Sequence, residues 1–253
     1  MAQMKRLVIA HRGHKIGAPE QTIAAFRMAV ELGATMNECD VRFSRDGVAL
    51  LMHDRQVDRT TSGSGAVRDL DWAELSKLDA GSTFDPRFST ERIPLLADLF
   101  ALADETGTAL CIEAKGETPA EYAAAAVYAA KEVARRGRLD IDVVAAFDHT
   151  ALAAAVEAVP GLRSAPDRLP ERGPSTAADL IAQAKAARAP IIQHYFADLD
   201  ATVVVEVQSA GIEVWAWPPA NLAEARFAYA SGAIGLMGDD VAAIVQSIAE
   251  AQT

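Results

Sequence analysis

Side chains that can exchange protons or bind anions stand at the ends of short apolar runs in this sequence. The run LVIA leads into His11 and Arg12, and the run LLM leads into His53. A third run, ALCI, leads into Glu113 and Lys115. Imidazole changes its protonation near neutral pH, whereas guanidinium and ammonium groups bind anions. Together these residues predict acid–base chemistry on an anionic substrate, provided that the fold gathers the three runs.

Two further carboxylates are spaced so that they share one face of a strand. In NECDV, alternation turns Glu38 and Asp40 to one face and Cys39 to the other. The same rule puts Glu113 and Lys115 together. Carboxylates packed side by side inside a protein repel each other unless they are protonated or bound to a cation. Three of them suit a hard divalent ion such as Mg²⁺ or Ca²⁺, and the sequence has no Cys and His cluster at zinc spacing.

The combined set of residues favours a phosphodiester as the substrate. Arg12 and Lys115 can hold an anion that the cation also polarises. His11 and His53 can exchange protons with an attacking oxygen and a leaving oxygen. Hydrolysis of a phosphodiester needs charge stabilisation and in-line positioning, and these groups can supply both.

Short β-like runs alternate with alanine-rich helical segments, which predicts a parallel sheet covered by helices. The expected strands span residues 7–11, 35–41, 48–52, 108–113, 141–147, 162–165, 190–194, 212–217 and 233–237. The expected helices span residues 20–33, 71–78, 94–106, 119–136, 149–158, 175–188, 200–210, 221–231 and 240–250. No linker, repeat or low-complexity tract divides residues 1–253, so we expect one domain.

One of the nine expected strands is surplus to an eightfold barrel. Residues 35–41 and 48–52 are joined only by FSRDG, whereas a parallel partner needs a crossover of a dozen or more residues. The Asp46–Gly47 turn therefore predicts a β-hairpin after the second barrel strand. The returning strand would bring His53 back to the mouth of the barrel. The other eight strands fit a (β/α)8 TIM barrel, in which chemistry is located at the C-terminal strand ends.

The composition excludes several classes of protein. The 253 residues carry a formal net charge of −11, which disfavours a nucleic-acid groove. Two cysteines, Cys39 and Cys111, do not make a disulfide scaffold, and reduced thiols are expected. No apolar run reaches the roughly 20 residues of a membrane span, and LVIA is too short for a signal peptide. We therefore expect a cytoplasmic protein that acts on a small molecule.

Five segments within residues 8 to 116 closely resemble the glycerophosphodiester phosphodiesterase family. They are HRG, APEQT, ECDV, HD followed by DRTTSGSG, and IEAK, in the order and spacing of the family. The resemblance implies a TIM barrel that depends on Mg²⁺ or Ca²⁺. The implied site residues are the acid–base pair His11 and His53, the metal ligands Glu38, Asp40 and Glu113, and the phosphate-binding Arg12 and Lys115. The segment AAFDH resembles the family's Ser-Phe segment more loosely and implies that Phe147 lines the pocket.

The chain departs from the family pattern at two places. PEQT replaces the usual PENT, so Gln21 stands in place of an asparagine. In EVWAWPPAN, Trp215 matches the family's tryptophan, but Ala216, Trp217 and Pro218 replace Thr-Val-Asn. Trp215 and Trp217 share one strand face. We therefore expect two aromatic walls in the pocket, and the alcohol that fits beside them is left open.

The main hypothesis is a metal-dependent hydrolase that cuts a small glycerophosphodiester-like compound into an alcohol and a phosphomonoester. In one alternative, a hydroxyl of the substrate is the nucleophile and a cyclic phosphate is released, as in the similar sphingomyelinase D enzymes. In another, the barrel binds anions without catalysis. The carboxylates could also be salt-bridge partners of Arg12, Arg42 and Lys115, but that leaves His53 unexplained. An enolase-like or aldolase barrel would need a lysine base, for which Lys115 is the candidate.

Overall fold

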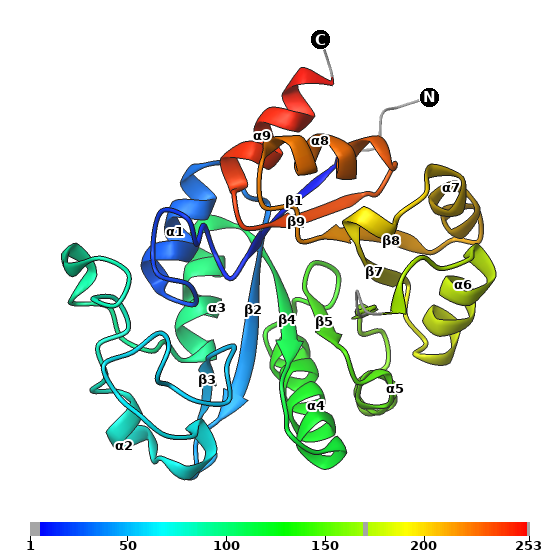
Figure 1. Cartoon of the computed structure of the whole chain (residues 1–253). Coiled ribbons are helices and arrows are strands. Elements are labelled where there is room, and N and C mark those ends of the chain that lie inside the picture. The colour runs from blue at the N-terminus through cyan, green and yellow to red at the C-terminus, as the bar shows by residue number, and fades with distance from the viewer. Residues whose placement is uncertain (1–5, 169–171, 252–253) are drawn as a thin grey trace.

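The computed structural model describes residues 6–168 and 172–251, whose strands form a nearly closed barrel (Figure 1). The strands are β1 (Leu7–His11), β2 (Met36–Phe43), β3 (Ala49–Leu51), β4 (Ala109–Ala114), β5 (Val143–Ala146), β6 (Ser164–Pro166), β7 (Ile191–Tyr195), β8 (Glu213–Trp217) and β9 (Gly235–Gly238). Eight of them pair in the order β6-β5-β4-β2-β1-β9-β8-β7, all in parallel. A parallel bridge between Asp167 and Gln193 joins the two ends of this path. The predicted (β/α)8 barrel is confirmed.

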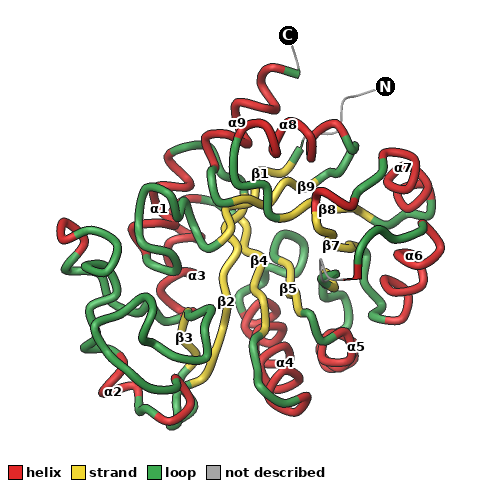
Figure 2. The backbone as a smooth tube through the Cα atoms, in the orientation of Figure 1, coloured by secondary structure: helices red, strands yellow, loops and turns green. Residues whose placement is uncertain are grey.

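Helices alternate with the strands and cover the outside of the barrel (Figure 2). They are α1 (Ile23–Glu31), α2 (Trp72–Leu75), α3 (Leu96–Thr106), α4 (Pro119–Arg135), α5 (His149–Ala158), α6 (Ala177–Ala186), α7 (Ala201–Ser209), α8 (Leu222–Ala230) and α9 (Val241–Glu250). Side-chain caps fix several of their starts, such as Thr22 before α1 and Thr118 before α4. The helix expected over 71–78 is only four residues long. After Ser76 the backbone amides donate to the carbonyl three residues earlier, as in a 3₁₀ turn, and no longer to the carbonyl four residues earlier. Within the described residues, no helix is both long and apolar enough to cross a lipid bilayer.

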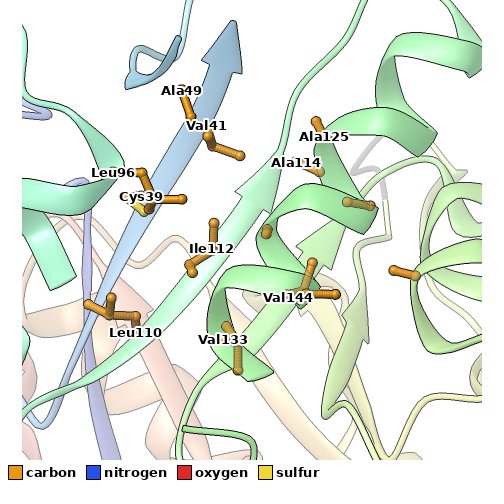
Figure 3. Close-up of a cluster of buried hydrophobic side chains, with 14 of the residues drawn as sticks. Cys39, Val41, Ala49, Leu96, Leu110, Ile112, Ala114, Ala125, Val133 and Val144 are labelled. Atoms are coloured by element: carbon orange, nitrogen blue, oxygen red, sulfur yellow. The ribbon is translucent and has the colours of Figure 1, made fainter. Parts of the chain in front are cut away.

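Strand alternation divides the core into two layers. Outward-facing side chains such as Cys39, Val41 and Ile112 pack against α3 and α4 (Figure 3). Inward-facing side chains such as Ile9 and Cys111 fill the lower part of the barrel. Cys39 and Cys111 therefore lie in different layers, and both are buried free thiols, as expected. The apolar filling of the barrel leaves only its C-terminal mouth for polar chemistry.

The expected hairpin is confirmed at the end of β2. β3 pairs antiparallel with the extension of β2, with Val41 opposite Leu51. The turn passes through Gly47 at φ 82°, a left-handed conformation that favours glycine. The strand then returns to the barrel, where the amide of Met52 donates to the carbonyl of Asp40 at 3.0 Å. The next residue, His53, is thereby brought to the mouth of the barrel.

A buried ion pair at the opposite end of the barrel leads to a stability prediction. Arg138 donates to Asp142 at 2.6 Å and to the carbonyl of Thr108 at 2.7 Å, and Asp142 accepts from the amide of Leu110 at 2.9 Å. Removing one partner of a buried pair leaves the other charge poorly compensated, and Arg138 would keep only the exposed Asp104 at 2.8 Å. We expect Asp142→Ala to lower the free energy of unfolding by about 3–5 kcal/mol, measured by urea denaturation.

The control for this variant is Glu105→Ala. Glu105 pairs with Arg27 at 2.7 Å, and both side chains are about half exposed. Exposed pairs contribute only about 0–1 kcal/mol. Equal losses in the two variants would contradict a structural role for the Arg138–Asp142 pair.

Candidate active site

A cavity of about 240 Å³ opens at the C-terminal ends of the barrel strands. Most of the residues singled out in the sequence line it, namely His11, Arg12, Glu38, His53, Glu113, Lys115, Phe147 and Trp217. Asp40 lies beneath them and is fully buried. A larger groove of about 620 Å³ runs between the β2–β3 hairpin and α4 and meets the cavity at Lys115. The smaller cavity contains the acid–base groups, so it is the candidate active site.

The three expected carboxylates form one cluster. Glu38, Asp40 and Glu113 each place a carboxylate oxygen within 4.8 Å of the other two. The parallel register makes this possible, because Asp40 and Glu113 are direct neighbours on β2 and β4. Burial raises the pKa of Glu38, and the charge of Asp40 raises it further. Burial likewise raises the pKa of Glu113. The cluster therefore holds more negative charge than it can easily bury.

Two cations partly neutralise the cluster. Lys115 places Nζ 3.0 Å from Asp40 and also pairs closely with Glu113. Arg12 places Nε 3.2 Å from Asp40. Burial opposes ionisation of Asp40, but the charges of Lys115 and Arg12 outweigh it and lower the pKa of this carboxyl. The salt-bridge partners considered for Arg12 and Lys115 are thus present within the same site.

A sharp turn after β1 positions Arg12. Arg12 has φ 61° and Gly13 has φ 82°, and a Cβ on Gly13 would lie 2.6 Å from the carbonyl carbon of Ala25. The amide of Arg12 donates to Glu38 at 2.9 Å. Gln21, which replaces the family's usual asparagine, donates to Asp40 at 2.6 Å. The HRG and PEQT segments therefore each donate a hydrogen bond to the carboxylate cluster.

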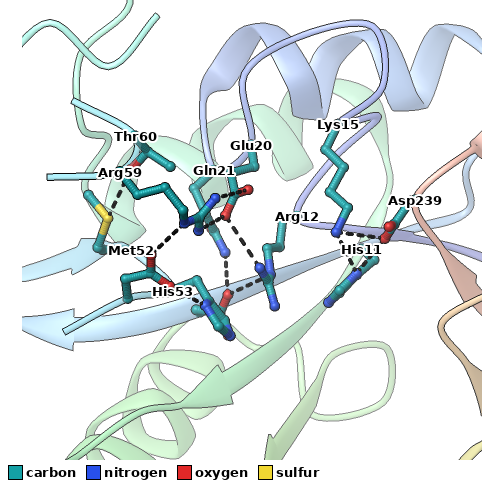
Figure 4. Close-up of polar contacts among 12 residues, drawn as sticks. His11, Arg12, Lys15, Glu20, Gln21, Met52, His53, Arg59, Thr60 and Asp239 are labelled. Carbon is teal, nitrogen blue, oxygen red and sulfur yellow. Dashed lines mark hydrogen bonds and ion pairs between the residues drawn. The ribbon is translucent and has the colours of Figure 1, made fainter. Parts of the chain in front are cut away.

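The two histidines are held in matching ways (Figure 4). Nδ1 of His11 lies 2.7 Å from Asp239, and Nδ1 of His53 lies 2.7 Å from Asp54. Lys15 places Nζ 2.9 Å from the same oxygen of Asp239. Among the described residues, neither Nε2 atom has a hydrogen-bond partner. A carboxylate on Nδ1 fixes the ring and leaves Nε2 free for proton transfer.

An ion network connects His53 to Arg12 on the other side of the cavity. Arg59 donates to Asp54, the partner of His53, and to both oxygens of Glu20 at 2.8 Å. Glu20 in turn lies 3.3 Å from Arg12 (Figure 4). The guanidinium of Arg42 also donates to the carbonyl of His53 at 2.8 and 3.0 Å. The hairpin that carries His53 is thereby tied to the first strand.

Both histidines are neutral near pH 7. The pKa of His11 is lowered to about 4, mainly by burial and less by the charges of Arg12 and Lys15, against the opposing effect of Asp239. Burial is also the main cause that lowers the pKa of His53. A neutral imidazole can accept a proton, whereas the donor of a proton must first acquire one.

The low pKa of His11 predicts that acid destabilises the protein. Between pH 6.5 and about 4 the unfolded chain binds a proton that the folded chain excludes. Stability from this source is fully present above pH 6.5 and is lost as the pH falls towards about 4. We expect His11→Asn to reduce the slope of the unfolding free energy against pH in this range, by an amount that corresponds to at most one proton. Urea unfolding of EDTA-treated protein measures it, and an unchanged slope would contradict a buried neutral His11.

Only one of the two tryptophans lines the cavity. Trp217 does so, and its ring packs edge-on against Phe147 with centroids 5.7 Å apart. Trp215 is fully buried one layer deeper, where its Nε1 donates to Glu213 at 3.2 Å. Alternation turns both rings inward, but residues two positions apart occupy successive layers of the barrel. The expectation of two aromatic walls from this strand was therefore wrong for Trp215.

Sequence reasoning missed several polar residues of the site. Asp239 follows β9, and the rule that strand ends carry chemistry would have found it. Asp167 and Gln193 also line the cavity, from the end of β6 and from β7, but no motif marks them in the sequence.

A family model described as the Glycerophosphoryl diester phosphodiesterase family matches residues 11–243. The chain belongs to this family. The solved glycerophosphodiester phosphodiesterase of Agrobacterium tumefaciens is similar, with 26% identity and a TM-score of 0.79 over 96% of this chain and 100% of that one. A phosphodiesterase from Oleispira antarctica, in complex with the product sn-glycerol-3-phosphate, has 25% identity and a TM-score of 0.86 over 96% of both chains.

Curated relatives of the family match mainly over part of their length. The glycerophosphodiester phosphodiesterase of Caldanaerobacter subterraneus subsp. tengcongensis is 49% identical over 112 residues, 44% of this chain and 46% of the relative. Glycerophosphodiester phosphodiesterase 1 of Homo sapiens is 41% identical over 110 residues, 43% of this chain and 33% of the relative. In these matches the chain spans less than half the length of the relatives.

Proposed function

We propose that this protein is a metal-dependent phosphodiester hydrolase. Its substrate would be a glycerophosphodiester-like small molecule, cut into an alcohol and a phosphomonoester. The observation that carries the proposal is the pair of carboxylate-held histidines beside a buried cluster of three carboxylates. The names of the similar family members agree with this activity.

The carboxylate cluster fits a divalent cation. Glu38, Asp40 and Glu113 would hold it, and Mg²⁺ and Ca²⁺ both prefer such oxygen ligands. Oε1 of Glu38 is buried and has no hydrogen-bond partner among the described residues, which suits an atom that binds a cation. When bound, the ion would stabilise negative charge on the phosphate and lower the pKa of water.

The side chains around the cluster would divide the remaining work. Arg12 and Lys115 would bind the phosphate oxygens. One histidine would take a proton from the attacking water through Nε2 as the new P–O bond forms. The other, after it has taken up a proton on Nε2 from solvent, would give that proton to the alcohol oxygen as the old P–O bond breaks. Phe147 and Trp217 would form the aromatic wall beside the alcohol, with Trp215 supporting them from below.

The test is hydrolysis of a phosphodiester panel by EDTA-stripped protein resupplied with Mg²⁺, Ca²⁺ or Mn²⁺. The panel contains glycerophosphocholine, glycerophosphoethanolamine, a lysophospholipid, a sugar phosphodiester and bis-p-nitrophenyl phosphate. We expect metal-dependent release of a phosphomonoester. A cyclic phosphate, seen by ³¹P NMR, would mean that a substrate hydroxyl is the nucleophile. Binding without turnover under every metal would mean a barrel that only binds anions.

The remaining expectations from the sequence stay predictions. They are a single domain over residues 1–253, a cytoplasmic location and a small-molecule partner in place of nucleic acid. The formal net charge of −11 supports the last of them, because it disfavours binding to a polyphosphate chain.

A further inference from the structure

One partly buried cation beside the active site has no carboxylate partner. Arg42 lies two residues after Asp40 on β2, so strand alternation turns it to the same face, one step nearer the mouth of the barrel. Arg12 and Lys115 both pair with Asp40, whereas Arg42 forms no ion pair among the described residues. Its Nε and Nη2 atoms donate to the carbonyl of His53, and Nη1 has no partner among those residues. A guanidinium has five N–H donors, so Arg42 can still bind an anion.

A second guanidinium lies beside the same open space. Arg55 stands two residues after His53, and its side chain is 65% exposed. Its Nη1 lies 3.9 Å from Glu117, which is beyond hydrogen-bond distance. Glu117 lies closer to Arg68, at 3.2 Å. Arg55 therefore also keeps donors that are available to a ligand.

Two grooves connect this arginine pair, Arg42 and Arg55, with the active site. Both residues line the groove of about 620 Å³ between the β2–β3 hairpin and α4, which meets the active-site cavity at Lys115. Both also line a groove of about 400 Å³ that meets the cavity at His53. A group held by the arginine pair can therefore belong to the same molecule as a phosphate in the cavity.

Most other charged side chains of the two grooves have partners in the protein. The ion pairs are Arg45 with Asp71, Arg59 with Asp54, and Arg68 with Glu117 and Glu121. The exposed Asp58 and Asp69 are screened by water and salt. The uncompensated positive charge is thus concentrated at the arginine pair. Phosphate and carboxylate groups match the planar donors of guanidinium, so the pair favours an anion over a neutral or cationic group.

We infer that Arg42 and Arg55 form a second anion subsite, which takes a phosphate or carboxylate group carried on one arm of the diester. This inference rests on the proposed phosphodiester hydrolysis, because the diester phosphate lies at the carboxylate cluster and its arm extends to the arginine pair. The preferred substrates are then diesters whose arm carries a further anionic group. Arg55 is a specificity-determining residue, and Arg42 both binds the arm and positions the backbone of His53.

The experiment compares two diesters that differ by one phosphate group, glycerophosphoglycerol and its terminal phosphomonoester. We expect wild-type kcat/KM to favour the phosphorylated arm by about tenfold or more at low ionic strength. High salt should reduce this preference, because it screens exposed charges. Arg55→Gln should remove most of it. Arg45→Gln is the matched control, since Arg45 lines the same groove but is held by Asp71, and it should leave the preference unchanged.

Arg42→Gln is a second variant that separates binding from positioning. It should lower kcat for both diesters, because the carbonyl of His53 loses two donors. It should also lower the preference for the phosphorylated arm. Equal losses with both diesters would mean that Arg42 only positions His53, and would overturn its part in the subsite.

Several outcomes would overturn the inference as a whole. A wild-type ratio near one would do so, as would an unchanged ratio in Arg55→Gln or an equal loss of preference in Arg45→Gln. Inorganic sulfate identifies the other source of an anion. A wild-type ratio near one, with a rate on glycerophosphoglycerol that responds to sulfate only while Arg55 is present, would assign the subsite to a free anion and not to the arm.

Failure of the proposed function is recognised separately. If no diester is hydrolysed, including bis-p-nitrophenyl phosphate, the proposed hydrolysis is refuted. The subsite is then tested by titration calorimetry with propane-1,3-diol bisphosphate and propyl phosphate. Tighter binding of the bisphosphate that Arg55→Gln abolishes supports the subsite, and equal binding of both ligands contradicts it.

Discussion

Replacing either cavity histidine by alanine is expected to lower kcat by about 10²–10⁴-fold, the usual contribution of a general acid or base. Nδ1 of His11 and of His53 is held by a carboxylate, so each ring presents Nε2 as its free nitrogen. The loss should appear in kcat more than in KM, because proton transfer occurs only in the transition state. Steady-state kinetics with the best diester of the panel measures it.

The control for the histidine variants is His194→Asn. His194 is a buried histidine that bonds to Ser175 and the carbonyl of Tyr195 and does not line the cavity. Its replacement should change kcat little, and circular dichroism should show that all three variants are folded. Wild-type rates in His11→Ala or His53→Ala would remove the proposed mechanism.

The second large effect is expected at the carboxylate cluster. Glu38→Gln and Asp40→Asn should each raise the metal concentration needed for half-maximal activity, by about tenfold or more. Each variant removes one anionic ligand from a site built of three. Titration of EDTA-stripped protein with Mg²⁺ or Ca²⁺ measures the shift, and unchanged titration curves would contradict the proposed metal ligands.

The same two variants should change metal-free stability in opposite directions. The pKa of Glu38 is raised in the folded protein, so its charge costs stability above the unfolded pKa, and Glu38→Gln should stabilise the protein in EDTA at pH 8. The pKa of Asp40 is lowered, because Lys115 and Arg12 pair with it. Asp40→Asn removes the carboxylate that these two buried cations share, so that Lys115 keeps only Glu113 and Arg12 keeps only Glu20, and should cost up to about 3–5 kcal/mol. Equal stability changes in both variants would contradict this division of charge.

The local pattern of the sequence predicted most elements of the barrel. Period-two runs and capped helices are short-range features, so the strand and helix positions agree closely with those expected. The hairpin was also predictable, because FSRDG is too short for a parallel crossover. The short length of α2 was not predictable. After Ser76 each amide donates to the carbonyl three residues earlier, and this change from the α-helical pattern depends on the loop that follows.

The identity of the site residues was predictable to a similar extent. Each of two pairs lies two positions apart in the sequence, Glu38 with Asp40 and Glu113 with Lys115. Strand alternation alone therefore puts the members of each pair on one face. The depth at which an inward side chain lies in the barrel was not predictable, because this depth depends on the stagger between neighbouring strands. Trp215 and Trp217 share a face, yet only Trp217 reaches the cavity.

By itself, then, the sequence determined the barrel, the hairpin, the family and the chemical types gathered at the mouth, because these follow from periodicity, turn length and motif order. Only the tertiary structure decided which carboxylate holds which histidine. Asp239 lies 228 residues from His11 in the chain and meets it only because β9 and β1 pair in parallel. The approach of Asp167 to Gln193 at the cavity likewise depends on the bridge that closes the barrel. Pairing between distant strands fixes such contacts, and no local pattern encodes it.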